Sequence, residues 1–401
     1  MTIQWRMRRS RGLTPVDPIT IVRRIAAGQG GGWIFRRDPP PAPFPKSIPL
    51  DAVTVAESRR KGEVEPLIRL ARDDMAVVDA LIVERMQSDV PVIPMLADHI
   101  VAAGGKRLRP LLTVAAARAV GAPNGMEAAV RLAASVEFIH TATLLHDDIV
   151  DASDLRRGKV AAHLIWGAPS SVLVGDFLFA RAFELMVETG QMRALGILAR
   201  ASSVISEGEV LQLTRAHDLG LDQDTYLQII SAKTAELFAA AAESGAVGAG
   251  ADETAVQALR AYGLNLGLAF QLADDALDYG GQAADLGKNT GDDFREGKVT
   301  LPLLLAAART KGHDDGFWER TINKGERHED DFKRARELVV GAGAVGATLD
   351  VAWDYADLAK AALAPLADSE WKTALETEGS QPRWKKLDLG SSSCSRAIAG
   401  S

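Results

Sequence analysis

Apolar residues recur at helical spacing over most of the chain, from about residue 50 to residue 376. One stretch illustrates the pattern, with steps of three, four or seven residues that place its apolar side chains on a single helical face: Val256, Leu259, Leu266, Phe270, Ala273 and Leu277. Alternation of the kind that predicts β-strands is scarce. Glycine- or proline-containing breaks interrupt the pattern at 104–105, 121–125, 167–169, 280–281 and 287–297. The sequence therefore predicts an all-α fold, a large single-domain helical bundle of about ten or more helices.

The two ends of the chain lack this pattern. Residues 1–47 are rich in arginine, with a glycine run and a proline-rich segment, which is typical of a loop or tail. The last segment is rich in glycine and serine. We therefore expect a disordered basic N-terminal extension over 1–47, one folded domain over 48–376 and a flexible tail over 377–401.

One glycine motif invites a different interpretation. Residues 341–346 spell G-x-G-x-x-G, which in dinucleotide-binding proteins follows a β-strand. Here the preceding residues, 332–338, are charged helix formers. We therefore predict a turn between two helices at this place and no nucleotide site.

Composition narrows the class of protein. A net charge of −7 argues against a nucleic-acid binder, which would show a basic face. No stretch approaches 18 uninterrupted apolar residues, so we expect no membrane span. The single cysteine, Cys394, excludes an intrachain disulfide framework and favours a reducing compartment. We expect a cytoplasmic protein, although the arginine-rich, acid-poor start is also typical of a mitochondrial transit peptide.

Two aspartate clusters of identical spelling carry the most chemical information. Both read D-D-x-x-D, the first aspartate cluster at 147–151 and the second aspartate cluster at 274–278. Residues four apart share one face of a helix, and like charges at that spacing destabilise an isolated helix. Carboxylate oxygens are the ligands that Mg²⁺ prefers, and such ions commonly hold substrate phosphates. Both clusters are therefore predicted to bind Mg²⁺.

Basic residues accompany these clusters. They occur in four short segments, at 104–110, 155–159, 286–288 and 297–299, together with Lys233 between the clusters. Lysine and arginine beside carboxylates that bind a hard metal suit a diphosphate, which bridges metal ions and accepts charge-assisted hydrogen bonds.

Together these motifs closely resemble the trans-type isoprenyl diphosphate synthases of the polyprenyl synthetase family, over roughly residues 50–370. The resemblance is carried by G-K-R-L-R-P at 105–110, by L-L-H-D-D-I-V-D at 144–151 with L-R-R-G at 155–158, by G-D-F-L at 175–178 and by F-Q-L-A-D-D-A-L-D at 270–278. It implies an all-helical bundle around a central cavity. It also implies that an allylic diphosphate ionises there and alkylates isopentenyl diphosphate.

The resemblance assigns roles residue by residue. Three Mg²⁺ ions in each active site would be bound by Asp147, Asp148, Asp151, Asp274 and Asp275, with Asp278 in support. The catalytic residues would be the first five of these aspartates together with Lys233. Contacts with the allylic diphosphate would come from Arg156, Lys233, Thr234, Gln271, Lys288 and Lys298. Contacts with isopentenyl diphosphate would come from Lys106, Arg109, His140 and Arg157. The family further implies a homodimer, with peripheral membrane contact for product release.

Product length should depend on the apolar cavity below the first aspartate cluster. Ala142 and Thr143, about one turn upstream, would line it, and both are small. In this family small residues there resemble enzymes that make long chains for quinone tails, so we expect a product of about eight to ten isoprene units. A shorter-chain, geranylgeranyl-type synthase, a catalytically silent partner subunit and a terpene cyclase are the alternatives. The two complete clusters argue against the silent subunit, and the G-K-R segment argues against the cyclase.

Overall fold

The computed structural model describes residues 65–102, 107–121, 126–156, 158–280 and 291–379. The predicted extension over 1–47 lies outside the described residues, as does the predicted tail from residue 380 onward. The last described helix continues to Gly379, a little beyond the boundary at 376 that the loss of periodicity suggested. Within the described ranges the fold is helical almost throughout, as the apolar spacing predicted.

The helices differ widely in length. They are α2 (Glu65–Arg85), α3 (Val92–Ala102), α4 (Leu108–Ala119), α5 (Met126–Val150), α6 (Ala162–Trp166), α7 (Ala168–Glu188), α8 (Met192–Arg215), α9 (Gln223–Ile230), α10 (Glu236–Gly248), α11 (Glu253–Gly280), α13 (Asp292–Glu296), α14 (Leu301–Arg309), α15 (Asp315–Trp318), α16 (Asp331–Gly341), α17 (Ala344–Ala362) and α18 (Glu370–Gly379). Two π-helical segments, η1 (Ser231–Ala235) and η2 (Glu319–Asn323), continue α9 and α15. One short hairpin pairs β1 (Leu155–Arg156) with β2 (Lys159–Val160) in antiparallel register.

The centre of the bundle is α10, whose residues are all buried. Most of its residues are small or apolar, which suits a fully buried helix, and its two glutamates, Glu236 and Glu243, are both paired with Arg260. It packs against α4, α5, α8 and α11. Contact with α4 is so close that a Cβ atom at Gly245 would lie 2.2 Å from the Thr113 carbonyl oxygen, so only glycine fits there.

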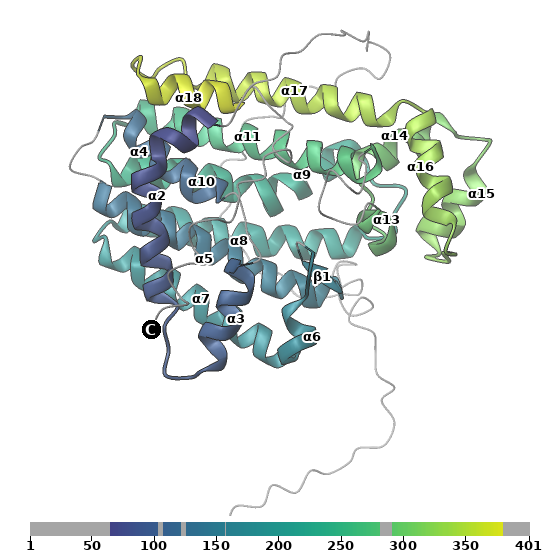
Figure 1. The fold of residues 1–401 in the computed structure, drawn as a ribbon. Coiled ribbons are helices and arrows are strands. Elements are labelled where there is room, and N and C mark those ends of the chain that lie inside the picture. The colour runs from purple at the N-terminus through teal and green to yellow at the C-terminus, as the bar shows by residue number, and fades with distance from the viewer. Residues whose placement is uncertain (1–64, 103–106, 122–125, 157, 281–290, 380–401) are drawn as a thin grey trace, which may run out of the picture.

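Two apolar cores meet along α11. Apolar residues of its first half belong to one core with residues of α4, α5, α7 and α10, while those of its second half belong to another with residues of α9, α14, α16 and α17. In Figure 1, α17 and α18 lie along one edge of the molecule and α3 and α6 lie at the opposite edge. The second aspartate cluster is on the second half of α11, and the first is at the end of α5, so both lie near the junction of the cores.

Local sequence signals account for several boundaries. Gly167 separates α6 from α7, with Pro169 in the first turn of α7, where its missing N–H costs nothing. The G-x-G-x-x-G segment is the predicted turn, because α16 ends at Gly341 and α17 begins at Ala344. The β1–β2 hairpin was not predicted, since each strand is too short to show alternation.

Among the described residues, α5 is the one helix long and apolar enough to cross a membrane. However, 61% of its most apolar window is buried inside the fold. That burial accounts for its composition, because a helix in the middle of a bundle needs apolar residues on most faces.

Candidate active site

The first aspartate cluster lies where α5 ends. The Asp151 amide donates to the Asp147 carbonyl at 2.8 Å, so the helical turn continues and the two side chains share one face. Asp148 points to a different side and is only 3% exposed. There it accepts hydrogen bonds from the Arg156 guanidinium, with Nε at 2.7 Å. Arg156 is on β1, so the hairpin brings this cation back onto the cluster that precedes it.

Lys298 connects the first aspartate cluster with the surroundings of the second. Its ammonium donates to Asp151 Oδ2 at 2.8 Å and also pairs with Glu296 Oε2 at 2.5 Å. Burial alone would lower the pKa of Lys298, but the charges of Asp151, Glu296 and Asp293 outweigh burial and raise this pKa above its ordinary value. The same ammonium acts against the rise in the pKa of Asp147 and of Asp275. The Lys298 backbone amide donates to the Asp293 carbonyl at 2.9 Å, and the Asp293 amide donates to Asp278 of the second cluster at 3.3 Å. One short segment therefore joins the two clusters, and its Lys298 pairs with the first.

Lys233 enters this site from the π-helical segment η1. Its ammonium donates to Glu209 Oε2 at 2.7 Å and to Gln212 Oε1 at 2.8 Å, both on α8. The approach of α8 to η1 depends on Gly208, where a Cβ atom would lie 2.9 Å from the backbone nitrogen of Lys233. Widened π turns are frequent at functional sites, because they redirect side chains that a regular helix would place elsewhere.

The second aspartate cluster is held mainly by neutral donors. Asp275 accepts from the Tyr226 hydroxyl at 2.6 Å and from Gln271 Nε2 at 2.7 Å. The Gln271 carbonyl in turn accepts from the Thr234 hydroxyl at 2.8 Å. Asp278 accepts from two backbone amides, those of residues 291 and 293, at 2.9 and 3.3 Å. Its carboxylate thereby fixes the start of α13 against α11.

Burial and mutual repulsion perturb several of these carboxyl groups. Burial, chiefly, raises the pKa of Asp147 to about 7, with Lys233 acting against the rise and Glu209 and Asp151 adding to it. Burial likewise raises the pKa of Asp275 to about 6, partly offset by its hydrogen bonds. The pKa of Asp293 is raised further, by burial and then by neighbouring carboxylates. The site thus concentrates negative charge that protons or cations must neutralise.

This donor set fits Mg²⁺. No three carboxylate, imidazole or thiolate groups surround a single point within the described ranges. Mg²⁺ does not need such a cage, because it keeps several waters and is bound through one or two carboxylates together with substrate phosphates. Buried carboxylates with raised pKa values are suited to that role.

Arg109 and His140 form a second basic locus, at the start of α4. Arginine can only donate, so the Arg109 Nη1–His140 Nε2 contact of 3.2 Å makes this imidazole nitrogen an acceptor. The Arg109 guanidinium also lies over the Phe238 ring, 4.4 Å from its centroid. Of the other predicted diphosphate ligands, Lys106, Arg157 and Lys288 lie outside the described residues.

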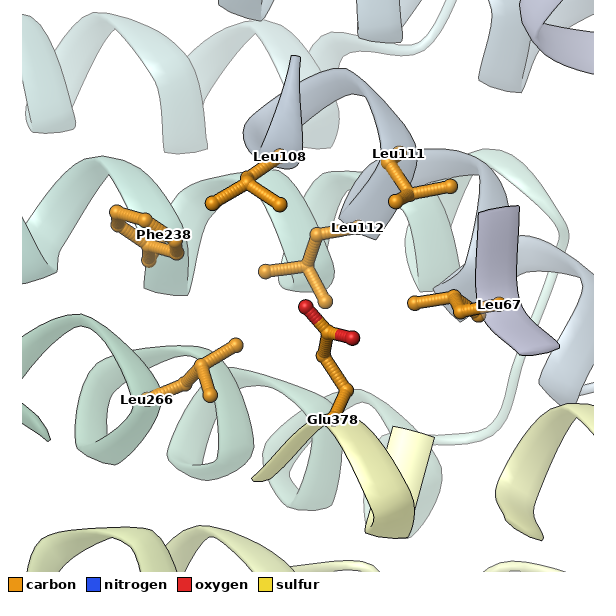
Figure 2. A pocket seen from close by; sticks show the side chains of 7 residues that line it. All are labelled: Leu67, Leu108, Leu111, Leu112, Phe238, Leu266 and Glu378. Atoms are coloured by element: carbon orange, nitrogen blue, oxygen red, sulfur yellow. The ribbon is translucent and has the colours of Figure 1, made fainter. Parts of the chain in front are cut away.

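The two predicted chain-length residues are placed on α5 just before the first cluster. Ala142 is fully buried, and the half-buried Thr143 donates its hydroxyl to the His140 carbonyl at 2.8 Å. The small pocket in Figure 2 lies elsewhere and is lined by neither of them. Its walls are Leu67, Leu108, Leu111, Leu112, Phe238, Leu266 and Glu378. The role of Ala142 and Thr143 stays a prediction.

Sequence reasoning missed five polar residues of the site: Glu209, Gln212, Tyr226, Asp293 and Glu296. One pair among them, Glu209 and Gln212, carried a usable signal, since its two polar residues lie three apart in a helical stretch, as one helical face requires. Tyr226 carried none, because a tyrosine in an apolar helix is most simply a core residue.

Comparisons with known proteins agree with this geometry. The family model for polyprenyl synthetase matches residues 90–339. The octaprenyl diphosphate synthase of Escherichia coli is 45% identical over 78% of this chain and 96% of its own length. A polyprenyl synthase from Caulobacter crescentus, crystallised with calcium and isoprenyl diphosphate, superposes with a TM-score of 0.79 at 67% identity, covering 81% of this chain and 98% of its own. A decaprenyl diphosphate synthase from Rhodobacter capsulatus superposes with a TM-score of 0.75 at 52% identity, covering 79% and 97%.

Proposed function

The chain belongs to the polyprenyl synthetase family and is a trans-prenyltransferase, and we propose that it condenses isopentenyl diphosphate with an allylic diphosphate to give a long-chain all-trans polyprenyl diphosphate. One observation supports this proposal more strongly than the others do. Lys298 pairs with Asp151 of the first cluster, and its backbone amide donates to Asp293, whose own amide donates to Asp278 of the second cluster. One short segment therefore joins both clusters to a cation. A diphosphate leaving group needs that combination of metal-binding carboxylates and fixed positive charge.

Mg²⁺ would be held by the aspartates of both clusters, and when bound it neutralises charge on the departing diphosphate. The chain supplies further cations of its own. Arg156, Lys233 and Lys298 are each paired with an acidic side chain of the site. An incoming diphosphate can replace those carboxylates as the partner, because its oxygens accept charge-assisted hydrogen bonds equally well. The cations are therefore in position before the substrate arrives.

The second substrate fits the basic locus at the start of α4. Arg109 is oriented by His140 and by the Phe238 ring, so its guanidinium is presented in a fixed direction. We assign isopentenyl diphosphate to this locus, with Lys106 and Arg157 as its further ligands. Guanidinium suits that role because its planar donors match two phosphate oxygens at once.

The reaction that follows from these placements has three changes of bonding. The allylic C–O bond breaks, and the diphosphate leaves with the electron pair. The double bond of isopentenyl diphosphate then attacks the allylic carbon, which forms the new C–C bond. A proton is finally lost from the adjacent carbon to give a trans double bond, and the released diphosphate is the base we propose. The apolar walls of the bundle keep out water, which would otherwise trap the cation.

For the product we propose a chain of octaprenyl to decaprenyl length, as used in quinone side chains. Two observations support it: the small residues Ala142 and Thr143 next to the first cluster, and the similarity to octaprenyl and decaprenyl diphosphate synthases. A geranylgeranyl-type product is the alternative, and product mass distinguishes the two.

We also propose a cytoplasmic homodimer with peripheral membrane contact. Apolar side chains are exposed on α6 and α7, with Leu164, Ile165 and Leu173 between 49% and 66% exposed. Such a face favours burial against a second copy. Sedimentation of the purified chain should show the mass of two copies, and flotation with phospholipid vesicles should show binding when long-chain product is present.

The decisive experiment is a direct assay of condensation. The purified chain is incubated with Mg²⁺, farnesyl diphosphate and labelled isopentenyl diphosphate, and product masses are measured. We expect all-trans polyprenyl diphosphates of octaprenyl to decaprenyl length. If no product longer than the primer forms, while the protein is folded, the proposal is wrong.

A further inference from the structure

Tyr226 has no assigned role, yet it is buried beside the second aspartate cluster. It is only 2% exposed, and it lies on α9, the helix that continues directly into η1. Its hydroxyl donates to Asp275 Oδ2 at 2.6 Å, which joins α9 to α11 at the level of the second cluster. Hydrogen bonds to an ionised acceptor are about twice as strong as those between neutral groups.

The direction of the whole network follows from Asp275. An ionised carboxylate only accepts, so the Gln271 amide nitrogen must face Asp275 and its carbonyl must face Thr234. The Thr234 hydroxyl then has to donate its single proton to Gln271. A continuous chain of three hydrogen bonds, one buried and two partly buried, therefore runs between Tyr226 and Thr234, through two side chains of α11.

This chain of hydrogen bonds ends beside the cation of the site. Thr234 is the immediate neighbour of Lys233 in η1, whose ammonium lies within hydrogen-bonding distance of Glu209 and Gln212. A π-helical turn is held by fewer favourable contacts than a regular helix, so neighbouring elements have to fix its side chains. The network from α11 fixes η1 on one side, and α8 fixes it on the other.

We propose that Tyr226 is a positioning residue for the allylic diphosphate. By holding Asp275, and through it Gln271 and Thr234, the Tyr226 hydroxyl keeps η1 and its Lys233 in the geometry that receives the diphosphate. This inference rests on the proposed function for the identity of the substrate. A site fixed in advance pays less ordering cost when ligand binds, so loss of the hydroxyl should weaken diphosphate binding.

The chain offers a matched control. Tyr262 is also fully buried, and its hydroxyl donates to the Leu375 carbonyl at 2.8 Å, on α18. Tyr226→Phe and Tyr262→Phe each remove one buried tyrosine hydroxyl and one hydrogen bond. Both variants should therefore lower the thermal midpoint of unfolding, but only the first should affect the diphosphate.

The test measures binding of inorganic diphosphate by calorimetry at fixed Mg²⁺, and then the KM for each substrate. For Tyr226→Phe we expect diphosphate affinity to fall about tenfold and the KM for the allylic diphosphate to rise, with the KM for isopentenyl diphosphate unchanged. For Tyr262→Phe we expect wild-type values of all three. Wild-type diphosphate affinity in Tyr226→Phe, or an equal loss in both variants, would overturn the inference.

A double-mutant cycle tests the route. If Tyr226 acts through Asp275, then adding Tyr226→Phe to Asp275→Asn should weaken diphosphate binding far less than it does in the wild-type background. Additive losses would mean that Tyr226 acts by some other route and would refute this inference. Failure of the wild-type chain to elongate any primer would instead contradict the proposed function, and the binding measurements would still decide the role of Tyr226.

Discussion

Replacing Asp147 by asparagine is expected to stabilise the metal-free protein at alkaline pH. Burial raises the pKa of Asp147 from 3.8 to about 7. A carboxyl group with a higher pKa in the folded than in the unfolded state binds its proton more tightly when folded. Its contribution to stability therefore falls as the pH rises from the unfolded value toward about 7, and it stays low above that pH.

The size of the effect follows from the same pKa. Each pKa unit is worth about 1.4 kcal/mol, so ionised Asp147 costs the folded state at most about 4 kcal/mol above pH 7. Asparagine carries no charge and removes this cost. At pH 5 the folded carboxyl is mostly protonated, but the unfolded carboxyl, with its ordinary pKa of 3.8, is ionised. The cost is therefore already about 1.7 kcal/mol at pH 5, and it disappears only below pH 3.8.

Urea unfolding in the presence of a chelator, at pH 5 and pH 8, measures this difference. We expect Asp147→Asn to raise the free energy of unfolding by about 4 kcal/mol at pH 8 and by only about 1.5 to 2 kcal/mol at pH 5. Asp73→Asn, at an exposed aspartate on α2, is the control and should change neither value. Added Mg²⁺ should stabilise the wild type at pH 8 more than the variant. Equal effects at both pH values would refute the electrostatic reasoning.

Three further predictions test other parts of the site. Lys298→Met leaves the partly buried Asp151 and Glu296 without their shared cation, so we expect a loss of at most about 3 to 5 kcal/mol in metal-free urea unfolding, partly restored by Mg²⁺. Unchanged stability would contradict the bridging role. Arg109→Lys keeps the charge but loses the planar donors, so steady-state kinetics should show about a tenfold higher KM for isopentenyl diphosphate and an unchanged KM for the allylic substrate. Ala142→Phe should shorten the product, as measured by mass spectrometry; a product of wild-type length from a folded variant would exclude Ala142 as a determinant of chain length.

The parts of the fold that the sequence predicted are those fixed by local physics. Helical periodicity predicted the bundle, and the break at 167–169 lies between α6 and α7 because glycine and proline act on their own backbone. The shared face of Asp147 and Asp151 is equally local, since it follows from the turn of one helix.

The remaining parts of the site depend on contacts between distant segments. Glu209 holds Lys233 only because α8 packs against η1, and Tyr226 reaches Asp275 only because α9 lies against the end of α11. Asp293 lies in a glycine-containing stretch that reads as a break between helices. Its burial beside the second cluster results from backbone amides that bind Asp278, which no spacing rule reports.

Identical spelling therefore does not give the two aspartate clusters identical chemistry. In the first, Asp148 and Asp151 are paired with Arg156 and Lys298, so their charge is matched by groups that a diphosphate can take over. In the second, Asp275 is held by a tyrosine hydroxyl and a glutamine amide, which orient the carboxylate but bring no positive charge. Those hydrogen bonds lower its pKa only part of the way, and the value stays near 6. Protons should therefore compete with Mg²⁺ at both clusters, through Asp147 with a pKa of about 7 in the first and Asp275 with a pKa of about 6 in the second. The first cluster should respond most to loss of its cations.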